Sequence, residues 1–81
     1  MNEKKKLAAA SAAYILGLSP NVKIRGTQEQ TSSLQEVLGA SRNLYVLLRD
    51  CPGGPELSTV LETKSAAARR FEKSFGYTWP F

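Results

Sequence analysis

The residues able to do chemistry are few and scattered in this 81-residue chain. It contains no histidine and one cysteine, Cys51, which excludes a histidine-based triad and a zinc site of ordinary ligand type. The serines have no activating base, and the carboxylates occur singly rather than in the pairs that acid–base catalysis uses. The stretch Pro52–Pro55 lacks the Gly-Lys-Ser/Thr ending of a phosphate loop. The sequence therefore predicts a protein that is not an enzyme and uses no cofactor or metal.

Basic residues are the second chemical feature of the sequence. Eleven Lys and Arg stand against seven Asp and Glu, a net charge of +4 that suits a nucleic acid or an acidic protein as partner. Lys64, Arg69, Arg70 and Lys73 occur along one predicted helix, where they could contact phosphates. The same set also suits the solvent-exposed face of an amphipathic helix. The sequence leaves both interpretations open.

The most informative pattern is residues 34–50, LQEVLGASRNLYVLLRD. Leu34, Val37 and Leu38 recur at helical spacing and are followed by Gly39. Residues 31–50 resemble the helix-turn-helix of small DNA-binding regulators of bacteria and phages. In that family a first helix ends at a glycine, a short turn follows, and the second helix opens with a Ser-Arg-type pair. The resemblance places the turn at residues 39–41.

The resemblance also implies which side chains would contact double-stranded DNA. Ser41, Arg42 and Asn43 would open the recognition helix, where arginine pairs with guanine, asparagine with adenine, and serine reaches a phosphate. Arg49 would contact the DNA backbone. The nucleic-acid-binding residues implied in this way, together with the basic set of the last helix, are Ser41, Arg42, Asn43, Arg49, Lys64, Arg69, Arg70 and Lys73. A plain amphipathic helix with an interior glycine is the alternative.

Three helices must position these residues, at about 3–17, 32–50 and 55–75, in a single domain covering residues 1–81. Asn2 is expected to cap the first helix and Gly17 to end it. Two pairs match capping boxes, Ser33 with Glu36 and Thr59 with Glu62. Pro55 suits the first position of the last helix, and Gly76 is expected to end that helix. Apolar stripes at helical spacing are Leu7, Ala10, Tyr14 and Leu18; Leu34, Val37, Leu38, Ser41, Tyr45 and Leu48; and Leu57, Val60, Leu61, Lys64, Ala68, Phe71 and Phe75.

These elements predict an all-α bundle, with the middle helix broken near Gly39. An α+β alternative pairs residues 22–25 and 44–48 as two parallel strands, because the first alternates apolar and polar residues and the second is apolar on every side. The aromatic tail Tyr77, Trp79 and Phe81 is expected to fold back onto the bundle, although an exposed Trp–Phe pair would anchor a protein partner.

Two functions follow as hypotheses: a helix-turn-helix DNA-binding regulator, or a protein-interaction module. The module would be an adaptor, an inhibitor or a self-associating subunit that uses an apolar patch from Val46, Leu47 and the aromatic tail. The single Cys51 favours a reducing, cytoplasmic location and is expected to be a buried or half-buried apolar residue. Three lysines followed by an apolar run have the outline of a signal peptide, but twelve alanine-rich residues are too few to span a membrane.

Overall fold

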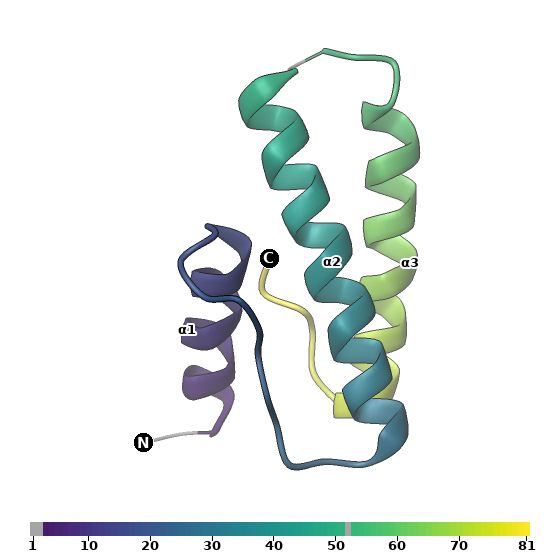
Figure 1. The fold of residues 1–81 in the computed structure, drawn as a ribbon. Coiled ribbons are helices and arrows are strands. Elements are labelled where there is room, and N and C mark those ends of the chain that lie inside the picture. Colours follow the sequence, from purple (N-terminus) through teal and green to yellow (C-terminus); the bar gives the residue numbers. More distant parts are fainter. Residues whose placement is uncertain (1–2, 52) are drawn as a thin grey trace.

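Three helices and a C-terminal tail make up the fold in the computed structural model, which describes residues 3–51 and 53–81 (Figure 1). Helix α1 covers Glu3–Ile15, α2 covers Gln28–Asp50 and α3 covers Leu57–Phe75. The all-α prediction is confirmed. The α+β alternative is wrong, because residues 44–48 are helical and no strand occurs within the described ranges.

Helices α2 and α3 form an antiparallel hairpin, and α1 and the tail cover one face of its lower half (Figure 1). The helix lengths explain this partial cover. With a rise of about 1.5 Å per residue, the 23 residues of α2 span roughly 35 Å and the 13 residues of α1 roughly 20 Å. Buried residues accordingly end at Ser41 in α2 and begin at Ala67 in α3. The hydrophobic core consists of Ile15, Leu34, Val37, Leu38, Ala40, Ala67, Phe71 and Trp79.

Helix α2 begins about one turn earlier than the sequence analysis predicted. Thr27 has extended backbone angles, so its Oγ1 accepts a hydrogen bond from Gln30 N, while Gln30 Oε1 accepts one from Thr27 N, each at 3.1 Å. The predicted capping box at Ser33 and Glu36 is therefore wrong. Ser33 lies inside the helix, fully buried, with its Oγ 2.6 Å from Ser74 Oγ of α3.

Helix α2 continues through Gly39 without a break, so the predicted break there is wrong. Gly39 is not among the glycines with positive φ. An interior glycine destabilises a helix by about 1 kcal/mol relative to alanine. Leu38 and Ala40 are buried on either side of it. Burying a side chain of the size of leucine stabilises the fold by about 1.5–3 kcal/mol, which outweighs the cost of the glycine in the helix.

The helix ends follow the glycines more closely than the polar cap candidates. Gly76, with φ of 83°, ends α3 as predicted. Gly17, with φ of 82°, ends α1: its N donates to Tyr14 O at 3.0 Å, and Leu18 N donates to Ala13 O at 2.8 Å. Helix α3 begins at Leu57 after Glu56, so the predicted capping box at residues 59 and 62 falls inside the helix and is wrong. The predicted cap Asn2 lies outside the described residues.

The aromatic tail folds back against the hairpin, as predicted. Trp79 is 6% exposed and its Nε1 donates a hydrogen bond to Ser41 Oγ at 3.0 Å. The rings of Tyr77 and Trp79 lie edge-on to fully buried Phe71, with centroids 5.4 and 4.9 Å away. The tail therefore adds buried aromatic side chains to the core.

The buried face of α1 differs from the predicted stripe. Ser11 and Ile15 are buried, whereas Ala10 and Leu18 are exposed. Cys51 is exposed at the C-terminal end of α2, so the expectation of a buried or half-buried cysteine is also wrong.

Candidate functional site

Two of the three residues that the helix-turn-helix resemblance placed at the start of a recognition helix, Ser41 and Arg42, make contacts within the fold. Ser41 is buried and accepts the hydrogen bond from Trp79. Arg42 Nη1 donates to the carbonyl oxygens of Tyr14 and Ile15, both at 3.2 Å. These carbonyls belong to the last turn of α1, where the helix dipole favours a cation. Of the three residues, Asn43 alone is exposed.

The remaining predicted contacts do not gather on one surface. Arg70 faces α2, where its guanidinium bonds Glu29 at 3.0 Å, Ser32 at 3.2 Å and Glu36. Arg49 pairs with the neighbouring Asp50 at 2.9 Å. Lys64 is half-buried, and Arg69 and Lys73 are exposed. Because Arg42 faces α1 while Arg70 faces α2, the predicted set is divided between two sides of the hairpin.

The hydrogen bonds of these arginines lower the pKa of two carboxyl groups. The Arg70 guanidinium holds the pKa of Glu29 below its ordinary value, by hydrogen bonding first and by its charge second. Arg49 lowers the pKa of Asp50 through the same hydrogen bonding. Both carboxyl groups are solvent-exposed, so these pairs contribute modestly to stability. The two ion pairs also neutralise Arg49 and Arg70, two of the cations that were predicted to contact DNA phosphates.

With α2 unbroken and Ser41 and Arg42 turned inward, the hairpin has no turn at residues 39–41 and no projecting recognition helix. DNA binding therefore stays a prediction that is based on the net charge and on the sequence resemblance alone.

An uncovered apolar surface lies at the upper end of the hairpin, above α1 and the tail. We call it the hairpin-end surface, and its exposed members are Leu48, 49% exposed, and Leu61, 45%; Phe81, 43% exposed, ends the tail below it. Half-buried side chains at helical spacing continue it on both helices: Leu44, Tyr45, Leu57 and Val60. These residues extend the stripes whose lower parts form the core. The aliphatic members were expected in or beside the core, but sequence spacing does not reveal that α1 is too short to reach them.

The patch predicted from Val46, Leu47 and the tail is only partly present. Val46 and Leu47 are half-buried, and Trp79 belongs to the core. From the tail, Phe81 alone keeps a large exposed area beside the hairpin. Its ring lies edge-on to that of Trp79, with centroids 5.5 Å apart.

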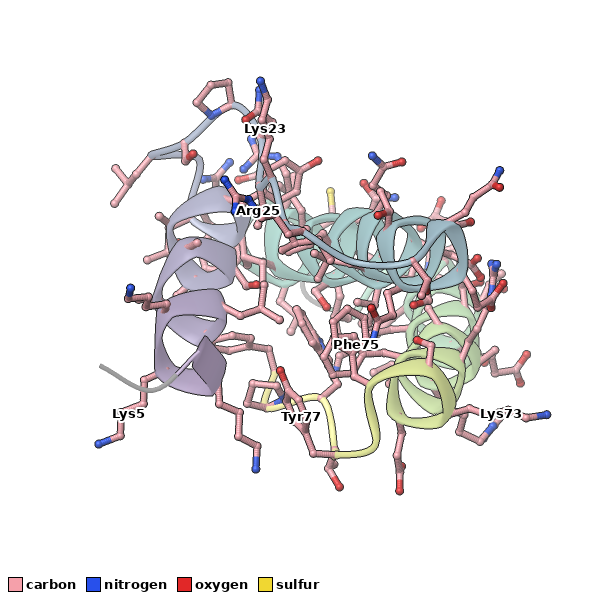
Figure 2. The ribbon with its side chains drawn as sticks, turned by 90° about the horizontal axis from the view of Figure 1, so that it is seen from below. Lys5, Lys23, Arg25, Lys73, Phe75 and Tyr77 are labelled. Atoms are coloured by element: carbon pink, nitrogen blue, oxygen red, sulfur yellow. The ribbon has the colours of Figure 1, made fainter. Side chains whose placement is uncertain are left out.

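A second open surface lies at the lower end of the molecule and is here called the basic groove. It is a cleft of about 570 Å³ between α1, the connecting segment 22–25 and the end of α3. Its lining residues are Lys4, Lys6, Leu7, Ala10, Val22, Lys23, Ile24, Arg25, Phe75 and Tyr77. Figure 2 looks into this end: Phe75 and Tyr77 lie between α1 and α3, and Arg25 lies on the connecting segment.

The groove combines an apolar floor with a basic rim. Leu7, Val22 and Ile24 are half-buried against the core, and four of the ten lining residues are cations, with no carboxylate among them. Lys4 Nζ lies 4.5 Å from the centre of the Tyr77 ring, a cation–π distance. Burial raises the pKa of the Tyr77 hydroxyl above its ordinary value.

Within the described ranges, no group of three or more His, Cys, Asp or Glu side chains comes together to hold a metal ion. None of the described helices is both long and apolar enough to cross a membrane. No protein-family model matches the sequence, and comparisons with curated proteins and with solved structures find no match.

Proposed function

We propose that this protein is a non-enzymatic interaction module that self-associates through the hairpin-end surface. The observation that carries the proposal is the uncovered upper half of the hairpin, where Leu48 and Leu61 are each nearly half exposed. In the lower half the same face is covered by α1 and the tail. Large exposed apolar side chains that are contiguous on one face indicate an interface.

The charges around the hairpin-end surface favour a second copy of this chain as the occupant. Arg49 and Lys64 occur in the same part of the hairpin as Asp50, Glu56 and Glu62, so both signs are present there. A two-fold arrangement brings identical surfaces together, which requires a surface that does not repel itself. The mixed charges meet that condition, although the whole chain carries +4.

The size of the surface sets the expected affinity. A standard interface uses about 20–30 residues from each partner, and the hairpin-end surface offers far fewer. We therefore expect a dimer with a dissociation constant of about 10–100 µM rather than an obligate assembly.

Sedimentation velocity over a range of concentrations tests the proposal. The wild-type chain should shift from monomer to dimer as its concentration passes the dissociation constant, and Leu48→Lys should remain monomeric. Leu16→Lys is the matched control, because Leu16 is also 49% exposed but lies just past α1 and not on the hairpin. A wild-type monomer at millimolar concentration, or equal loss of dimer in both variants, would refute the proposal.

A spin label on Cys51 gives a second measurement, since this exposed residue is the chain's one cysteine and lies at the end of α2 beside the hairpin-end surface. Pulsed electron paramagnetic resonance should detect a defined distance between labels in the wild-type dimer. The Leu48→Lys variant should show none.

A further inference from the structure

The basic groove offers a second binding site, independent of the hairpin-end surface. We propose that it binds an extended segment of another protein in which acidic and apolar residues alternate. That segment adds as a strand along residues 22–25, places its apolar side chains in the groove and pairs its carboxylates with Lys23 and Arg25.

Charge determines that the occupant is acidic. Lys4 and Lys6 line the groove from α1, and Lys23 and Arg25 line it from the connecting segment. The lining contains no carboxylate. In the described part of the chain Lys23 and Arg25 have no ion pair, whereas Arg49 and Arg70 have acidic partners. A second copy of this groove would be repelled, and an anionic segment is attracted.

The connecting segment determines that the occupant is extended. Residues 22–25 run past α1 towards the start of α2, and the chain bends after them at Gly26 (Figure 1). None of the backbone hydrogen bonds in the described part of the chain joins residues 22–26 to another element. Its N–H and C=O groups therefore form an open edge that a strand can complete.

The alternation along the segment matches such a partner. Val22 and Ile24 are half-buried against the core, and Lys23 and Arg25 are exposed between them. In a paired strand, side chains opposite each other lie about 4.5–5.5 Å apart, so acidic residues at every second position meet Lys23 and Arg25. The intervening apolar residues then point towards Phe75 and the aromatic ring of Tyr77, which lie inside the groove in Figure 2.

The probe is a fluorescent eight-residue peptide of alternating glutamate and valine, titrated with the full chain and followed by fluorescence anisotropy. We expect saturable binding that weakens with added salt. The double variant Lys23→Glu/Arg25→Glu should bind at least about tenfold more weakly, because it turns two attractive cross-strand pairs into repulsive ones. Both residues are exposed, and circular dichroism should show unchanged helix content.

The matched control is Arg69→Glu/Lys73→Glu, which makes the same charge change at exposed positions of α3 outside the groove lining. Figure 2 shows Lys73 pointing away from the groove. This control should bind the peptide within about threefold of wild type. Equal loss in both double variants would reduce the site to unspecific charge attraction and overturn the proposal.

Three further results would overturn it. The first is no peptide binding at millimolar concentration. The second is unchanged affinity for both of two peptides, one N-methylated at the glutamates and one at the valines, because one of the two must block the edge that faces residues 22–25. The third is tighter binding of duplex DNA or phosphatidylserine vesicles with loss in the Lys23→Glu/Arg25→Glu variant, which would assign the groove to a nucleic acid or a membrane surface. Leu48→Lys should leave peptide binding unchanged, so the two proposals fail separately.

Discussion

Replacing Arg42 with alanine separates a structural role for this residue from a role in DNA readout. Its guanidinium donates two hydrogen bonds to the last carbonyls of α1. Hydrogen bonds to a charged group contribute about 1.5–3 kcal/mol each, and a cation at a helix C-terminus contributes about 0.3–1 kcal/mol. Arg42 is half-buried and both bonds are long at 3.2 Å, so we expect Arg42→Ala to lower the free energy of unfolding by about 2 kcal/mol in total.

That loss is large for a chain of this size, whose stability is expected to be roughly 5 kcal/mol. It corresponds to a fall in Tm of about 10 °C. The loss should be local as well as global, because Arg42 joins α1 to the hairpin. Hydrogen exchange should therefore accelerate most at the amides of α1, before those of the α2 core around Leu34 and Val37.

Asn43→Ala is the control, since Asn43 is the exposed neighbour of Arg42 on the same helix. It should change the stability by no more than about 0.5 kcal/mol. The reasoning is refuted if Arg42→Ala stays within that range, or if the amides of α1 exchange at the wild-type rate. Loss of duplex DNA binding without loss of stability would instead support the helix-turn-helix hypothesis.

Three other predictions concern buried and charged groups. Ser11 Oγ is buried with no hydrogen-bond partner in the described structure, so Ser11→Ala should raise the free energy of unfolding by about 1 kcal/mol in a denaturant titration. Trp79→Phe should lower it by about 2–3 kcal/mol by opening a cavity and leaving Ser41 Oγ unpaired, and adding Ser41→Ala should recover part of the loss. Because Arg70 lowers the folded-state pKa of Glu29 below its ordinary 4.5, their pair stabilises the protein above that pH and is lost as the pH falls through the folded-state pKa. Arg70→Met should therefore flatten the acid limb of the stability curve, and an unchanged limb would contradict the pairing.

The sequence was sufficient to predict the helices because apolar spacing and the backbone freedom of glycine act locally. The α3 stripe and the glycine that ends it predicted that helix to within two residues. The sequence did not predict the N-terminal caps of the helices correctly, because several polar pairs satisfy the same capping pattern. Thr27 with Gln30 and Ser33 with Glu36 both fit a capping box, and packing of Ser33 against Ser74 places the second pair inside the helix.

The sequence could not orient the residues of the predicted site, for a related reason. Ser41, Arg42 and Asn43 have side chains that could contact DNA, and the sequence does not show where each one points. The tertiary structure turns Ser41 towards Trp79 and Arg42 towards the end of α1, across separations of 38 and 27–28 residues. Gly39 permits a turn, but burial of the residues on both sides keeps the helix straight.

By itself the sequence determined that the chain is helical, basic and without the side chains for histidine or zinc chemistry, because these properties depend on composition and short-range spacing. The tertiary structure alone decided which parts of the apolar stripes are covered. Helix α1 is shorter than the hairpin it packs on, so the upper stripe at Leu48 and Leu61 stays open. The basic groove forms where α1, the connecting segment and the end of α3 meet. Both surfaces become visible only when the helices are packed together.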